Sequence, residues 1–265
     1  MYASFVVAAL LLIALQRHQG SIMSFEEYGR IHHRIPFVLD IKENGAELIY
    51  FGIRHTRNPA DPQFGEAFRL WKKLKPTLAY NEDITAGPRT TLSESIAMDG
   101  ERGAISFWAK QDRIPIRSID LSRAEEFQLL SKGIPPERIK MFYLLRSLQQ
   151  LLQRPSEGGF HRSAEQIAGS DLRMLAKQGV SGKPRSITEI DAVWQRLGIR
   201  GDWRTPDIKW VEPGGKGPLN KVGRASSELR DQHMVEVLRA ALRRGERVFA
   251  LVGASHVVMQ EPALR

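Results

Sequence analysis

The chain has 265 residues, of which 42% are hydrophobic and 26% charged, so it is long enough for one large globular domain with an ample core. It contains no cysteine, which excludes disulfides, cysteine-ligated zinc, thiol catalysis and a lipoprotein anchor. The net charge is +9, but no basic run is interleaved with stacking aromatic residues, so we expect a solvated basic surface and no nucleic acid as a partner.

The N-terminal segment, residues 1–23, begins with the almost wholly apolar run MYASFVVAALLLIAL. This run is short for a membrane-spanning helix, which needs about 20 residues, and has the length typical of the apolar region of a secretory signal. No Lys or Arg precedes it, and no clear cleavage site follows it. Two interpretations stay open, a signal peptide and a short membrane anchor, and a wrongly assigned start is a third. We expect an exported protein, periplasmic or extracellular, or a membrane-anchored one.

The first predicted elements are a hairpin and a βαβ unit. Residues 35–41 and 46–51 are predicted strands joined by an Asn-Gly turn, and the second strand ends in the motif Gly-x-x-His at His55. A helix over residues 63–75 and a strand over 77–80 follow. Because such crossovers are right-handed and join parallel strands, Glu82 is expected at the same edge of the sheet as His55.

Helices are predicted over residues 93–98 and 103–110, and a strand over 114–119 ends at Asp120. Asp120 or Ser122 is the expected N-cap of a helix over 123–132, and a longer helix covers 135–153. Residues 154–224 are rich in Gly, Pro, Arg and Ser, with room for helices over 163–178 and 188–197. We interpret this segment as an insertion in a single α/β domain of residues 24–265, either a lid or a loosely packed connector.

The last predicted elements are a helix from Ser226 or Ser227 to about Arg244 and a strand over residues 248–252. This strand ends in a second Gly-x-x-His motif, at His256. One such motif is typical of a histidine in a turn, whereas its repetition after a second strand favours a functional site. If the two strands are adjacent and parallel, the two histidines meet at the edge where open α/β sheets bind ligands. We predict a central mixed, largely parallel sheet with helices on both faces.

The predicted strand ends carry imidazoles and carboxylates, the donors that divalent manganese, cobalt or zinc bind. A bound ion lowers the pKa of a water in its open position. The candidate metal ligands are His55, Glu82 and His256. The remaining candidates are Glu101 as a general base and Arg230 as the cation that holds an anionic group or a developing oxyanion, with Arg54 and Arg57 as alternatives to Arg230. Asp120, Glu101 and Arg230 also have ordinary interpretations, as a helix cap and as surface charges.

These segments resemble the superfamily that groups erythromycin-esterase-like, ChaN-like and TraB/Tiki proteins. The resemblance rests on GIRH at 52–55, Glu82, GE at 100–101, RD at 230–231 and GASH at 253–256, and it covers residues 46–120 and 226–259. It implies an α/β fold in which the paired Gly-x-x-His motifs, a glutamate and a late arginine line one cleft. For this chain it implies catalytic roles for His55, Glu82, Glu101, Arg230 and His256.

The resemblance does not imply one activity. Tiki-like members are similar to metal-dependent proteases, erythromycin-esterase-like members to hydrolases that activate water with a histidine, and ChaN-like members bind haem iron. The chain lacks the Glu beside Gly of the esterases, and Arg54 stands where Tiki and TraB members have a smaller residue. We expect a hydrolase that cleaves a peptide or ester bond in a peptide or small-molecule substrate. The alternatives are a non-catalytic protein that binds iron, haem or an anion, and an inactive relative that binds a partner.

Overall fold

The computed structural model describes residues 20–83, 87–152 and 162–265. The chain divides into two compact units, unit 1 formed by Met1–Asp120 and Asp231–Arg265 and unit 2 formed by Leu121–Arg230. The apolar run on which predicted export or anchoring depends lies outside the described residues. None of the helices in the described ranges has the length and apolarity of a membrane span.

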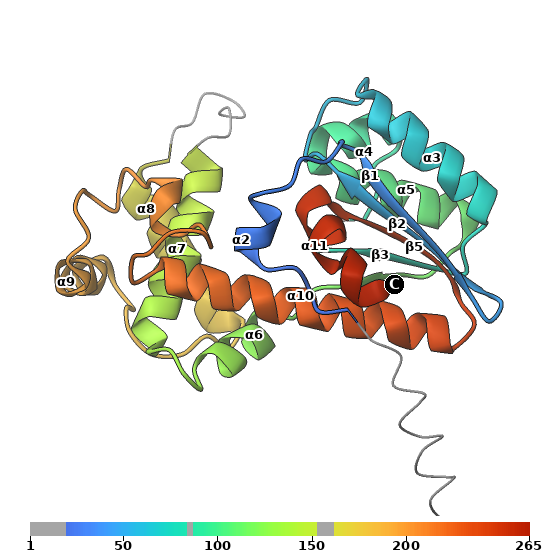
Figure 1. The fold of residues 1–265 in the computed structure, drawn as a ribbon. Helices are drawn as coiled ribbons and strands as arrows, with labels where there is room; N and C mark the ends of the chain where they lie inside the picture. Colours follow the sequence, from blue (N-terminus) through green and yellow to red (C-terminus); the bar gives the residue numbers. More distant parts are fainter. Residues whose placement is uncertain (1–19, 84–86, 153–161) are drawn as a thin grey trace, which may run out of the picture. The chain divides into compact units, whose positions relative to one another are not determined.

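Unit 1 is built on a five-stranded sheet with the strand order β1-β2-β5-β3-β4. Strands β1 (Phe37–Glu43) and β2 (Ala46–Ile53) form the predicted antiparallel hairpin, and the turn residues Asn44 and Gly45 both have positive φ, as this type of two-residue turn requires. Strands β5 (Arg247–Gly253), β3 (Leu78–Asn81) and β4 (Ile116–Ser118) continue the sheet in parallel. The predicted mixed, largely parallel α/β fold is thus confirmed (Figure 1).

Helices cover both faces of this sheet because the side chains of its buried strands alternate between two apolar clusters. On one face Tyr50 and Val252 pack with Met234 and Leu238 of α10 (Asn220–Arg243) and with α11 (Ala254–Leu264). On the other face, Phe249 packs with buried residues of α3 (Pro62–Leu74) and α5 (Glu101–Asp112). The alternation follows from the period of two in a strand. The remaining helices of unit 1 are α2 (Phe25–Tyr28) and α4 (Leu92–Asp99).

Capping residues set the helix boundaries that position the site. Asp61 accepts a hydrogen bond from the backbone of Gln63, and Pro62 opens α3. Thr91 and Glu94 form a capping box at the start of α4. Ser122 and Glu125 form another at α6 (Arg123–Leu130). The alternative caps predicted for α6 are therefore resolved in favour of Ser122.

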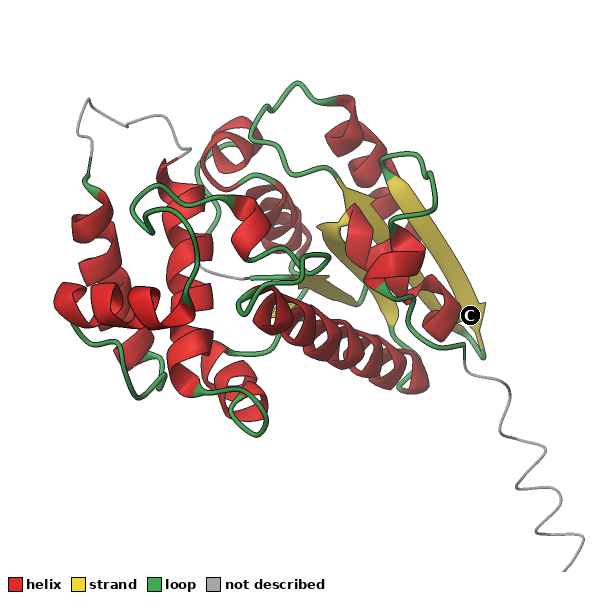
Figure 2. Cartoon of the chain, turned by 60° about the vertical axis from the view of Figure 1, so that its left-hand side comes forward, coloured by secondary structure: helices red, strands yellow, loops and turns green. Residues whose placement is uncertain are grey.

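Unit 2 consists of helices packed around their own apolar cluster, and every strand of the described residues belongs to unit 1 (Figure 2). Buried side chains of α7 (Pro136–Leu152), among them Phe142 and Leu145, pack with those of α8 (Ala164–Lys177) and α9 (Ile187–Leu197). A 3-10 helix, η2 (Ile208–Trp210), lies near the end of the unit. The helices predicted within residues 154–224 are present as α8 and α9.

The predicted start of one helix is wrong, and one further helix is not predicted. Helix α10 begins at Asn220 and not at Ser226 or Ser227; Ser226 is buried within it, and its hydroxyl bonds the carboxylate of Glu126. Helix α11, which the sequence did not predict, follows β5 without a loop. His256 therefore lies in the first turn of a helix.

Candidate functional site

The two Gly-x-x-His motifs end adjacent parallel strands. Strands β2 and β5 are paired so that Ile53 lies opposite Gly253, the last residue of each strand. His55 follows β2 in a loop, and His256 follows β5 in α11. Because the strands are parallel and in register, both histidines emerge at the carboxyl edge of the sheet, where α/β folds bind ligands.

The imidazole of His55 is held by Glu101, in the first turn of α5. Its Nδ1 lies 2.8 Å from Glu101 Oε1, and 64% of the His55 side chain is exposed. The hydrogen bond from the ring to Glu101 raises the pKa of His55, with further contributions from the charges of Glu101 and Glu82, while burial and Arg102 oppose the shift. Since a carboxylate only accepts hydrogen bonds, Nδ1 is the donor and Nε2 of the neutral ring carries a free lone pair.

The backbone before His55 is fixed by a buried glutamine. Gln63, in the first turn of α3, accepts from the amide of Arg54 at 3.0 Å and donates to the carbonyl of Arg54 at 2.9 Å. The side-chain amide thus pairs with the main chain as a neighbouring strand would. This pair of hydrogen bonds holds the backbone one residue beyond the end of β2, at Arg54, which is next to His55.

The imidazole of His256 is held in the same way by Asp231 of α10. Its Nδ1 lies 2.6 Å from Asp231 Oδ1, and the His256 side chain is 12% exposed. Asp231 is fully buried. The carboxylate again selects the tautomer with the proton on Nδ1, so that Nε2 is the available nitrogen.

Glu82 follows β3, the neighbour of β5, and contacts the second histidine motif. Its Oε1 accepts the amide of Gly253 at 2.7 Å, and its Oε2 lies 3.9 Å from Nε2 of His256. Asn81, buried at the end of β3, donates to the carbonyl of Leu251 at 2.6 Å and ties this strand end to β5. The carboxylate of Glu82 therefore faces the free nitrogen of His256 from a rigid strand end.

His55 and Glu82 both approach Gly253. A Cβ on Gly253 would lie 2.9 Å from Nε2 of His55 and 3.4 Å from Oε1 of Glu82. The absent side chain thus allows His55 to approach the backbone that also binds Glu82. The structure brings His55, Glu82 and His256 together at one edge, as the strand pattern predicts.

The other predicted residues take different places. Glu101, predicted as a general base, contacts Nδ1 of His55 and not Nε2, the nitrogen with the free lone pair. In this position Glu101 holds the ring of His55. Arg230 is half-buried on α10, directly before Asp231, and is the last residue of unit 2. Asp120 follows β4, which is separated from β2 by β5 and β3.

Sequence reasoning missed three polar residues that support the site. In the sequence, Asp231 stands out only as the neighbour of Arg230, and no motif marks Gln63 or Gln260. Gln260 donates to Asp231 Oδ1 at 2.6 Å. The spacing of four between His256 and Gln260 is a detectable signal only once a helix is known to begin at Ala254. Gln63 and Asp231 carry no local signal, because their partners are distant in the chain.

The donor set suits a divalent ion. Two imidazole nitrogens and one carboxylate are present, and each ring donates its other N–H to a second carboxylate, as metal-binding histidines do. Within the described ranges, however, no three His, Asp or Glu side chains gather closely enough to hold an ion. Metal binding by His55, Glu82 and His256 therefore stays a prediction.

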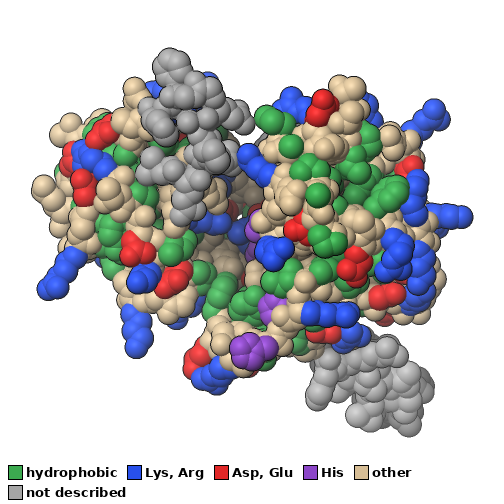
Figure 3. Space-filling view, turned by 90° about the horizontal axis from the view of Figure 1, so that it is seen from above, with side chains coloured by type: hydrophobic (Ala, Val, Ile, Leu, Met, Phe, Trp, Pro, Cys, Tyr) green, Lys and Arg blue, Asp and Glu red, His purple; other side chains and the backbone are tan. Residues whose placement is uncertain are grey.

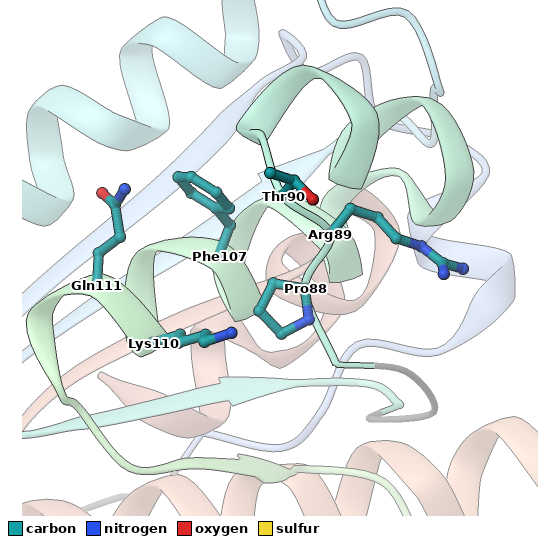
Figure 4. A pocket seen from close by; sticks show the side chains of 6 residues that line it. All are labelled: Pro88, Arg89, Thr90, Phe107, Lys110 and Gln111. Atoms are coloured by element: carbon teal, nitrogen blue, oxygen red, sulfur yellow. The ribbon is translucent and has the colours of Figure 1, made fainter.

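A separate pocket of unit 1 shares no residue with this site. It is lined by residues of α5 and of the loop before α4: Pro88, Arg89, Thr90, Phe107, Lys110 and Gln111 (Figure 4). Arg89 and Gln111 stand at opposite ends of this group in the view of Figure 4, so its polar groups do not converge. Lys and Arg side chains stand at many separate places over the face shown in Figure 3, as expected for a solvated surface.

No known protein family, curated protein or solved structure matches the chain.

Proposed function

We propose that the chain is a hydrolase of peptide or ester bonds that activates water at the paired Gly-x-x-His motifs. One observation carries the proposal: each histidine donates Nδ1–H to a carboxylate, which turns Nε2 to the other side of the ring, and Nε2 of His256 faces Glu82. A carboxylate–imidazole pair of this kind is the arrangement by which a histidine accepts a proton from a nucleophile and stabilises the charge it gains. Two such pairs at one strand edge favour catalysis over a structural role for either histidine.

The spacing between His256 and Glu82 suits an attacking water. Nε2 of His256 and Oε2 of Glu82 are 3.9 Å apart, too far for a direct hydrogen bond, and one water molecule can bond both. Nε2 takes a proton from this water as its oxygen bonds to the substrate carbonyl carbon. The tetrahedral intermediate collapses when the amine or alkoxide leaves, and the imidazolium returns the proton to the leaving group.

His55 serves the same reaction from the more exposed side. Its ring is 64% exposed and its pKa is raised by Glu101, so it is protonated over a wider pH range than a free imidazole. The imidazolium is a donor for the carbonyl oxygen as negative charge develops there. Arg230, Arg54 and Arg57 remain candidates for binding an anionic group of the substrate.

The metal-dependent form of this proposal uses the same residues. His55, Glu82 and His256 would hold manganese, cobalt or zinc, which when bound would lower the pKa of a water ligand and polarise the carbonyl. Glu101 and Asp231 would then orient the two rings. The resemblance to the erythromycin-esterase-like, ChaN-like and TraB/Tiki superfamily supports both forms, and export or membrane anchoring through residues 1–23 belongs to the same proposal.

Binding of iron or haem without catalysis is the second candidate from the sequence. The aromatic residues that would stack on a macrocycle in that function are Tyr50, Phe51 and Tyr80. All three are buried in the core of unit 1. The hydrolase is therefore the function that the described residues support best.

The test is hydrolysis of a panel of peptides and aryl esters by the full chain. The panel is assayed with chelator and with manganese, cobalt or zinc, for the wild type, His55→Ala, His256→Ala and the control His32→Ala, which removes an exposed histidine outside the site. We expect turnover by the wild type and the control, and loss of about 10²–10⁴-fold in each site variant. Activity that survives chelation favours the metal-free form. Equal turnover by all four proteins would rule the proposal out.

A further inference from the structure

A line of buried polar side chains lies behind His256. Tyr50 of β2, Gln260 of α11 and Asp231 of α10 are each fully buried, and the surroundings are apolar residues such as Met234 and Val257. Burying a hydroxyl, an amide and a carboxylate costs free energy unless each is hydrogen-bonded. Three polar groups in one apolar layer therefore call for an explanation beyond packing.

The hydrogen bonds of this line run in one direction. The hydroxyl of Tyr50 donates to Oε1 of Gln260 at 2.9 Å. Nε2 of Gln260 donates to Oδ1 of Asp231 at 2.6 Å. The same oxygen accepts Nδ1–H of His256 at 2.6 Å. Because the carboxylate of Asp231 only accepts, the amide nitrogen of Gln260 must face it, and Oε1 of Gln260 then accepts from Tyr50.

The positions of these residues follow from the fold. Gln260 lies four residues after His256, one turn further along α11, so both side chains face α10. Tyr50 lies on the strand whose end leads to His55, and it contributes its hydroxyl from the sheet side. The sheet, α10 and α11 thus each supply one member of the line.

We propose that Gln260, anchored by Tyr50, is a positioning residue that holds the Asp231 carboxylate and thereby favours the Nδ1–H tautomer of His256. The catalytic consequence rests on the proposed function, whereas the control of the tautomer does not. An apolar side chain of similar volume would fill the same space but would remove the hydrogen bond that Gln260 donates to Oδ1 of Asp231. This oxygen would then be held less firmly toward the ring, and the preference for the Nδ1–H tautomer would weaken.

The experiment compares the full chain with Gln260→Met and Tyr50→Phe, with histidine labelled by ¹⁵N. The nitrogen chemical shifts report which ring nitrogen carries the proton, and loss of one signal set in His256→Ala assigns His256. We expect one tautomer, protonated at Nδ1, in the wild type and a mixture of tautomers in both variants. His55, whose ring is held by Glu101, is the internal control and keeps its shifts.

Tyr50→Phe keeps the proposal testable if Gln260→Met does not fold, because it removes a single hydroxyl. An unchanged His256 tautomer in the folded variants would overturn the proposal. Where the wild type turns over a substrate, kcat falls by about 10–100-fold in Gln260→Met with KM little changed, the size typical of residues that orient a histidine. If the wild type hydrolyses nothing, the proposed function fails, and the tautomer measurement still decides the role of Gln260.

Discussion

The buried carboxylate of Asp231 accepts a hydrogen bond from Nδ1 of His256 at 2.6 Å, although the two residues lie 25 positions apart on different helices. Glu101 makes the equivalent contact with His55 at 2.8 Å from a third helix. Two histidines that share a motif therefore also share a type of partner. The partners are unrelated in sequence, so the likeness arises only in the folded chain.

Replacing Asp231 by Asn tests the carboxylate that holds His256. Asn keeps the volume but can present its NH₂ group to the ring, which selects the tautomer with the proton on Nε2. We expect kcat for any responsive substrate to fall by about 10²–10⁴-fold, as for loss of a buried carboxylate behind a catalytic histidine. Glu236→Asn, an exposed change on the same helix, is the control and should leave kcat unchanged. Equal rates for the two variants would contradict the role of Asp231.

Replacing Glu101 by Gln tests the raised pKa of His55. The folded-state pKa is raised chiefly by the hydrogen bond to Glu101, so the stability it contributes is fully present below the ordinary imidazole value of about 6.5 and is lost as the pH rises through the folded value. The wild type should therefore exceed Glu101→Gln in free energy of unfolding more at about pH 6 than at about pH 9.

Two measurements check this expectation. Proton NMR follows the His55 ring through its titration, and the midpoint should move to lower pH in Glu101→Gln. Urea unfolding at the two pH values gives the difference in stability. Glu236→Gln removes an exposed charge of the same sign and serves as the control. A titration midpoint that stays in place would show that Glu101 does not govern the His55 ring.

Replacing Gly253 by Ala tests the close approach of His55 to this residue. The new methyl group would meet Nε2 of His55 at 2.9 Å, which forces the ring out of its present position. We expect hydrolysis, or metal binding if it occurs, to be lost while the fold persists. Gly65→Ala is the matched control: a Cβ there meets no atom within 4 Å, and in a helix this change stabilises by about 0.5–1 kcal/mol. Activity of Gly253→Ala at the wild-type level would contradict the packing of His55 against Gly253.

Replacing Gln63 by Ala tests the pair of hydrogen bonds to the backbone of Arg54. The change leaves a part-buried amide and carbonyl without their partner, which costs about 1–3 kcal/mol in the free energy of unfolding. Arg69→Ala, an exposed change on the same helix, should cost less than about 0.5 kcal/mol. Urea unfolding of both variants measures the difference. The prediction fails if the two variants are equally stable.

The sequence by itself determined the elements whose causes are local. The hairpin turn follows from Asn44 and Gly45, whose backbone needs positive φ, and β2 and β5 follow from apolar runs with Gly at or next to their ends. The crossover rule then placed Glu82 on the same edge as His55. These inferences needed only neighbouring residues and the handedness of the chain.

Only the tertiary structure decided which groups hold the histidines. Ser226, a cap candidate in the sequence, lies inside α10 and pairs with Glu126, 100 positions away in the chain. In the sequence, Asp231 and Gln260 are ordinary polar residues of a helix. They are buried and hydrogen-bonded behind His256 because α10 and α11 pack on the same face of the sheet. Burial turns such polar groups into obligatory hydrogen-bond partners, and burial depends on contacts that no local pattern specifies.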